Sequence, residues 1–169
     1  YNPLLEDVEK PMTYEEGMAL IAAGLEPLGK EYVEQAKIGM DPASGWTDVY
    51  PNEDKRSGAY SAPVYGVHPY MLLNYKETRT DLFTVAHALG HSLHTVYSHE
   101  TQPYCYSDYT IFVAEVASTL NEGLLLAHLL GQVKDELGEA ADAFGNYSSV
   151  IEQVKEQLLA HELIKFHVV

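Results

Sequence analysis

The sequence has little cysteine, little positive charge and no long hydrophobic run. Cys105 is the only cysteine among 169 residues, so no disulfide can form within the chain, and a reducing, cytoplasmic location is expected. Ten basic residues stand against 25 acidic ones, and the net charge of −15 would repel nucleic-acid phosphates and anionic lipid. No apolar run approaches the roughly 20 residues that cross a bilayer. We therefore expect neither nucleic acid nor a membrane as a partner.

Helical periodicity dominates what is present. Thr13 and Glu16 form a capping box, which predicts a helix start at that point. Apolar residues then recur at helical spacing in several segments. The predicted helices cover residues 13–25, 27–37, 80–98, 107–130, 133–144 and 147–166, the fourth of them capped by Ser107 or Asp108.

The texture changes between residues 40 and 78, where prolines, glycines and aromatic residues collect. Short strand-like runs at 47–50, 59–65 and 70–75 indicate a small sheet. The predicted fold class is therefore mainly α with a small β-sheet. We expect one domain over residues 1–169, with the β region at 40–78 inside it.

Two histidines of the predicted helix 80–98 suggest a metal site. His87 and His91 are four residues apart, so both rings project from one helical face and can reach one metal ion. The spacing alone is weak, since the chain has eight histidines. However, His94 and Ser98 continue the same stripe, and this stripe is separate from the apolar one.

The next predicted helix supplies a candidate third ligand. Glu115 lies inside the apolar run 111–117, where a buried and unpaired carboxylate would cost several kcal/mol. A metal ion shared by the two helices would balance its charge, although a neighbouring Lys, Arg or His could do the same. Two His and one Glu leave the fourth position of zinc open, as in catalytic zinc sites. The side chains predicted to form hydrogen bonds around these ligands are His94, Ser118, Thr119 and Glu122.

The residue after His87 breaks the pattern of zinc peptidases. Their signature is H-E-x-x-H, in which the Glu beside the first His is the general base. This chain has Ala88 at that position. Alanine has no titratable atom, so we expect a chain that retains metal binding and lacks peptide cleavage.

Four segments in order resemble the oligoendopeptidase F family, a branch of the thimet-oligopeptidase-like zinc metallopeptidases. They are KRSGAYS at 55–61, HPYMLLNY at 68–75, HALGHSLH at 87–94 and IFVAEVASTLNE at 111–122. The resemblance covers roughly residues 3–130. It implies a zincin-like core of a zinc endopeptidase that acts on short peptides.

The resemblance also implies roles for individual residues. His87, His91 and Glu115 would bind Zn²⁺, and a Glu would be usual where Ala88 stands. An extended peptide would add as a strand along a substrate groove. The residues implied for this groove are Ala59, Tyr60, Ser61, His68 and Tyr70.

The chain also departs from the family. Family members are several times longer and carry a later Tyr- and His-containing segment, for which residues 131–169 show no counterpart despite Tyr147 and His161. We therefore expect an excised or minimised catalytic core, with self-association or a partner chain completing the groove. Ala88 is explained by a deliberate Glu→Ala replacement, which we favour, or by a natural pseudo-peptidase. In the second case the chain would be a non-catalytic metal- or peptide-binding domain.

Overall fold

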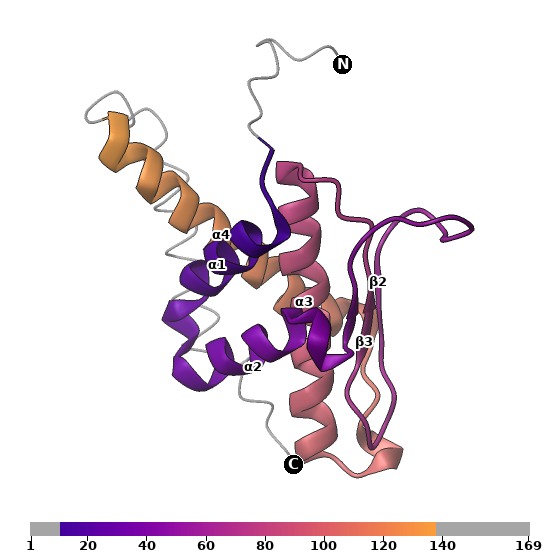
Figure 1. Cartoon of the computed structure of the whole chain (residues 1–169). Coiled ribbons are helices and arrows are strands. Elements are labelled where there is room, and N and C mark those ends of the chain that lie inside the picture. Colours follow the sequence, from indigo (N-terminus) through magenta and orange to yellow (C-terminus); the bar gives the residue numbers. More distant parts are fainter. Residues whose placement is uncertain (1–10, 138–169) are drawn as a thin grey trace.

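The computed structural model describes residues 11–137. Helix α3, Arg79–Thr101, runs through the middle of the molecule. Helices α1 and α2 lie on one side of α3 and the strands lie on the other (Figure 1). Helix α4, Ile111–Leu137, packs against both α3 and α1.

The first two helices follow the local signals of the sequence. Helix α1, Tyr14–Gly24, begins after the predicted capping box of Thr13 and Glu16. The helix predicted at 27–37 starts later, because a short 3-10 turn η1, Glu26–Leu28, precedes it and ends at Gly29 with φ 94°. Helix α2 then runs over Lys30–Met40. The prediction was therefore wrong at both ends by about one turn.

Helix α3 begins within one residue of the predicted start and ends at Thr101 rather than at residue 98, whereas helix α4 differs at both ends. Thr78 and Asp81 form a capping box at the start of α3. Helix α4 does not begin at Ser107 or Asp108, because Tyr104–Tyr106 form a separate 3-10 turn, η3, which Ser107 caps. The predicted break between residues 130 and 133 is also wrong, since the helix continues to Leu137. Gly131 does not end the helix, because a single glycine costs a helix only about 1 kcal/mol. The predicted helix 147–166 and residues 138–144 lie outside the described part.

The small sheet has three short strands: β1, Thr47–Asp48; β2, Tyr60–Ala62; and β3, Tyr70–Leu72. A 3-10 turn η2, Pro42–Ser44, precedes the first. The order is β1-β3-β2, with β1 parallel and β2 antiparallel to β3. Strand β2 ends earlier than predicted, because Pro63 lacks a donor and Gly66 turns the chain with φ 85°. The strands β1 and β3 are also shorter than predicted, although Leu73 and Tyr75 still donate to the carbonyls of Asp48 and Val49. Strand β2 lies at one edge of the sheet.

One hydrophobic core connects the helices and the sheet within residues 11–137. Helix α3 contributes the fully buried Leu82, Leu89 and Leu93, Met71 comes from β3, and Leu125 comes from α4. The prediction of a mainly α fold with a small β-sheet is confirmed. The extent of a single domain over 1–169 stays a prediction. None of the helices in the described part combines the length and apolar character that crossing a bilayer requires.

Helices α3 and α4 approach each other very closely at Gly90. A β-carbon at this position would lie 2.6 Å from Cα of Ser118 and 2.8 Å from the carbonyl oxygen of Ala117. Such distances are far inside van der Waals contact, so only glycine fits there. This close approach brings the neighbouring side chains of the two helices together.

Candidate metal centre

Two helices supply the candidate metal ligands. His87 and His91 project from α3 on either side of Gly90, and Glu115 projects from α4 one turn before Ser118. One ligand atom from each of the three residues lies within 4.8 Å of the others. All three side chains are half-buried. We call His87, His91 and Glu115 the metal group.

The distances within the metal group are those of atoms that could share an ion. His87 Nε2 lies 3.0 Å from His91 Nε2 and 3.4 Å from Glu115 Oε2. His91 Nε2 lies 3.7 Å from Glu115 Oε1. Tetrahedral zinc with bonds of about 2.0–2.1 Å places neighbouring ligand atoms roughly 3.3 Å apart. The donor set and its spacing therefore fit a zinc ion with one position left for water or substrate.

Glu122 of α4 orients the ring of His87. Its Oε1 lies in very close contact with His87 Nδ1. An ionised carboxylate only accepts hydrogen bonds, so Nδ1 donates and the lone pair of a neutral ring lies on Nε2. That is the nitrogen facing His91 and Glu115. A carboxylate behind a metal-binding His is the usual way to hold its tautomer.

Two hydroxyl groups on α4 lie beside Glu115 and make different contacts. Ser118 is fully buried, and its Oγ donates to Oε2 of Glu115 at 2.8 Å. Thr119 is exposed and donates only to backbone carbonyls, that of Glu115 at 2.5 Å and that of Val116 at 3.5 Å. Ser118 thus orients the carboxylate itself, whereas Thr119 contacts the helix backbone.

Burial favours the neutral form of His91. Desolvation lowers the pKa of His91, and the charge of His87 lowers it further, while Glu115 acts in the opposite direction. A hydrogen bond with the backbone of Ala114 also holds His91 to α4. A neutral imidazole is the form that binds a metal ion.

The histidine stripe predicted from the sequence leads away from the metal group after His91. His94 is buried, and its ring stacks on Tyr109 with the ring centroids 3.8 Å apart. Desolvation by burial, with a smaller effect of His91, lowers the pKa of His94 to about 4. Ser98, one turn later, donates to the carbonyl of Ser107 at 2.7 Å. The end of the stripe therefore contacts the segment that leads into α4.

A cavity of about 500 Å³ lies between α3 and β2, next to the metal group. We call it the α3–β2 cavity. Ala88 forms part of its wall although only 3% of this residue is exposed. Three residues predicted for the substrate groove also line it: Ala59, Tyr60 and Ser61. The structure thus brings the metal group, Ala88 and the edge strand to one opening.

His68 and Tyr70 lie elsewhere. Tyr70 pairs with Ala62 in the sheet and lines a separate hollow of about 220 Å³. The His68 ring stacks on Trp46 at 5.5 Å and contacts Tyr70 at 4.6 Å. Neither side chain lines the α3–β2 cavity, and their place in a substrate groove stays a prediction.

Sequence reasoning missed two residues that hold this region together, Ser92 and Asn121. Ser92, fully buried, exchanges a hydrogen bond with Ser61 of β2 at 2.8 Å. Asn121 of α4, also fully buried, donates to the carbonyl of Ala86 at 3.2 Å and accepts from Tyr32 at 2.9 Å. Buried polar side chains usually have a hydrogen-bond partner. The partners of these two residues, however, are distant in the sequence.

Comparisons with known proteins bear on the same segments. The model of peptidase family M3 matches residues 16–158. The chain is 48% identical over 136 residues to Oligopeptidase PepF of Bacillus subtilis. This alignment covers 80% of this chain and 20% of that protein. The chain is 44% identical over 136 residues to an Oligoendopeptidase F homolog of Lactococcus lactis, with 80% and 22% covered. The chain therefore spans about a fifth of the length of these curated relatives.

A solved structure shows the same likeness. A candidate peptidase from Chlamydophila abortus superimposes with a TM-score of 0.72 at 47% identity, covering 77% of this chain and 21% of that one. The arrangement of α3, α4 and the small sheet is thus shared with a relative of much greater length. Since the family model spans most of the sequence, the chain belongs to peptidase family M3.

Proposed function

We propose that this chain is the metal-binding core of a zinc-dependent peptidase that hydrolyses short peptides. In its present form, with Ala88, the chain would bind zinc and peptide without cleaving the peptide. The observation that carries the proposal is the metal group, three ligand atoms from two helices at spacings that suit zinc. Membership of peptidase family M3 supports peptide hydrolysis as the family activity.

The residues of the chain would divide the work at such a site. His87, His91 and Glu115 would hold the ion, with Glu122 and Ser118 orienting two of these ligands. A bound zinc ion lowers the pKa of a water ligand and polarises a peptide carbonyl. The neutral state favoured for His91 suits metal binding.

Ala88 explains the proposed lack of cleavage. A general base at this position would accept a proton from water and return it to the leaving amine, which is typically worth 10²–10⁴-fold in rate. The alanine methyl group can do neither. Ala88 lines the α3–β2 cavity, so a longer side chain there would have open space on the correct side of α3.

Strand β2 offers the edge for a peptide substrate. It is an edge strand of the sheet, and its residues 60 and 61 line the cavity beside the metal group. An extended peptide that pairs with such an edge gains backbone hydrogen bonds regardless of its sequence. This placement would bring a peptide bond to the metal group.

Restoring the general base tests the proposal. The Ala88→Glu chain, loaded with zinc, should hydrolyse a mixture of short peptides at least about 10²-fold faster than the parent chain. The matched control is Ala88→Gln, which adds the same length without a carboxylate and should stay inactive. Equal hydrolysis by the Glu and Gln variants would contradict the assigned role.

A second measurement tests the metal group without relying on activity. The parent chain should bind zinc in a 1:1 ratio in calorimetry, and His91→Ala should lose this binding. His128→Ala is the control, because His128 lies on α4 and contacts Gln132 rather than the metal group. If the parent chain bound no zinc under these conditions, the proposed site would be wrong.

A second candidate function rests on Ala88 itself. If alanine is native, the chain is a non-catalytic metal- or peptide-binding domain, which would retain zinc binding and gain nothing from Ala88→Glu. Zinc binding combined with an inactive Ala88→Glu variant would favour this reading.

A further inference from the structure

A second and larger cavity adjoins His91 of the metal group and extends along α3 toward His99. It has a volume of about 690 Å³ and shares Ser61 and His91 with the α3–β2 cavity. We call it the tyrosine cavity. The aromatic and apolar residues of its wall are Pro63, Tyr65, Tyr104, Tyr109, Ile111 and Ala114. A peptide that passes the metal group along β2 would therefore meet this cavity on one side of the bond to be cleaved.

Hydrogen bonds and ring contacts hold two walls of the tyrosine cavity in place. The hydroxyl of Tyr65 donates to the carbonyl of Gln102 at 3.1 Å, and its ring contacts those of His99 and Tyr104 at 4.9 and 5.2 Å. The hydroxyl of Tyr109 lies 2.6 Å from Oγ1 of Thr95. Walls that are ordered in advance reduce the entropy that a ligand must lose on binding.

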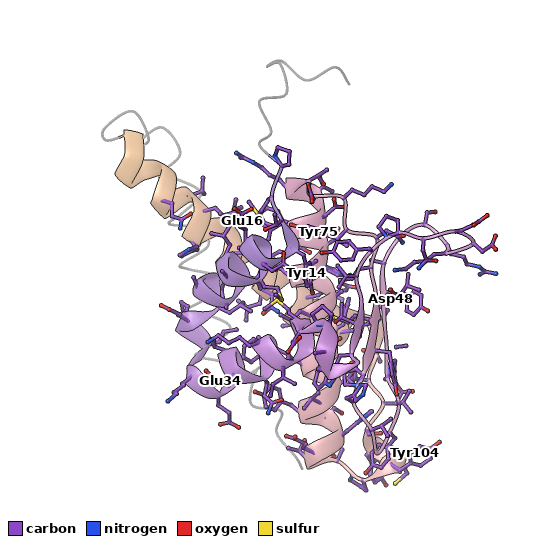
Figure 2. All side chains as sticks on the ribbon, viewed as in Figure 1. Tyr14, Glu16, Glu34, Asp48, Tyr75 and Tyr104 are labelled. Carbon is purple, nitrogen blue, oxygen red and sulfur yellow. The ribbon has the colours of Figure 1, made fainter. Side chains whose placement is uncertain are left out.

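Two large side chains on the rim are exposed in a way that the fold does not explain. Tyr104 is 74% exposed and Ile111 is 75% exposed, yet both line the cavity. Figure 2 shows Tyr104 at the end of the sheet region farthest from Tyr75. Single exposed apolar residues are ordinary, whereas several around one hollow mark a binding site.

We propose that the tyrosine cavity is a specificity site that receives a large apolar or aromatic side chain of the peptide. This inference rests on the proposed peptidase function and adds the substrate preference. Its wall offers stacking surfaces rather than paired charges. Asp108 is the carboxylate on the wall, and the net charge of −15 also disfavours an acidic side chain.

The single thiol of the chain provides a direct readout. Cys105 is exposed and lines the tyrosine cavity, so a side chain seated there should slow its alkylation by iodoacetamide. The probes are N-acetylated, C-amidated pentaglycine peptides in which the central residue is Gly, Phe, Arg or Asp. The Phe peptide should protect Cys105 at a concentration at least about tenfold lower than the Gly peptide requires.

Matched variants distinguish binding in the tyrosine cavity from nonspecific adsorption of the peptide. Tyr104→Ala and Ile111→Ala should remove the Phe preference. Tyr106→Ala and Phe112→Ala should retain it, because these residues are 72% and 83% exposed without lining the cavity. All four side chains are exposed, so we expect every variant to fold. The fluorescence of Trp46, a core residue, checks this expectation. Protection rates are compared with and without peptide within each variant.

Several results would overturn the inference. Equal protection by the Gly and Phe peptides would do so, as would stronger protection by the Arg or Asp peptide. An equal loss in Tyr106→Ala and Tyr104→Ala would show nonspecific adsorption instead.

The peptidase proposal can fail separately. Cleavage by Ala88→Glu without a Phe preference would retain the peptidase and reject the specificity site. Phe-dependent protection of Cys105 without cleavage would support the site and reject the peptidase.

Discussion

Helix α3 contacts α4 through glycine and buried amide groups, whereas it contacts β2 through a pair of serine hydroxyls. On the α4 side, Gly90 allows backbone contact and Asn121 bridges to Ala86. On the β2 side, Ser92 meets Ser61, and open cavities flank this contact. The first contact fixes the metal group rigidly, and the second leaves room for a ligand beside it.

Adding one methyl group at Gly90 should have the largest effect on the contact between α3 and α4, measured as stability and zinc binding. Gly90→Ala forces α3 and α4 apart at the backbone, so we expect a loss of more than about 3 kcal/mol in the free energy of unfolding. Zinc binding should fall with it, because the ligands lie on the two separated helices. Urea denaturation and calorimetry would measure both quantities.

Gly123→Ala is the matched control for that experiment. A β-carbon at position 123 of α4 would meet nothing within 4 Å, so the substitution should raise stability by about 0.5–1 kcal/mol. Equal behaviour of the two variants would show that the close contact at Gly90 does not limit the helix pair.

The second largest effect should come from acid, which lowers the free energy of unfolding through the buried His94. Burial lowers the pKa of His94 to about 4, so the unfolded chain, with an ordinary pKa near 6.5, binds more protons below that value. Stability should therefore fall as the pH drops from about 6.5 to about 4, by about 3 kcal/mol in total from this residue.

His94→Phe should remove most of this slope while keeping a ring against Tyr109. Urea denaturation in the presence of a chelator, at several pH values, measures the difference between the two chains. An identical slope in both chains would mean that the pKa of His94 is the same in the folded and unfolded states.

Removing the amide bridge should have a smaller effect. Asn121→Ala leaves the buried hydroxyl of Tyr32 without its acceptor, and we expect a loss of about 2 kcal/mol. Thr119→Ala is the control, since this exposed residue contacts only the backbone and should change stability by less than about 0.5 kcal/mol. A similar loss in both variants would show that the bridge to Tyr32 does not account for the effect, since alanine itself favours a helix.

Removing the serine contact between α3 and β2 should have the smallest effect of the four changes, after those at Gly90, His94 and Asn121. Ser61→Ala should cost about 1 kcal/mol and speed amide exchange in Tyr60–Ala62, while zinc binding stays unchanged. A double-mutant cycle with Ser92→Ala isolates the pair. Impaired zinc binding in Ser61→Ala would show that the two contacts of α3 are coupled.

Local signals located the helices better than the sheet. The capping box at Thr13 fixed the start of α1 correctly, and helical periodicity placed the start of α3 within one residue. In contrast, the runs at 59–65 and 70–75 yielded strands of three residues each. Strand length depends on a pairing partner, and Pro63 and the turn at Gly66 end the pairing of β2 at Ala62.

The candidate site shows the same division. The spacing of His87 and His91 placed two candidate ligands on one helical face. The prediction that Glu115 is buried in an apolar run was wrong in part, because Ile111 and Phe112 of that run are exposed and Glu115 is only half-buried. The destinations of His94 and Ser98 could not be read in this way. Both contact the segment just before α4, whose position depends on the turn η3 rather than on helical period.

The sequence by itself determined the starts of α1 and α3, the two histidines on one stripe and the alanine where zinc peptidases carry a carboxylate, because each follows from neighbours within a few residues. Only the tertiary structure decided that Glu122 orients His87, that Gly90 lets α4 approach and that two cavities adjoin the metal group. These features depend on the distance and rotation between packed elements. Such quantities arise from contacts between residues far apart in the chain.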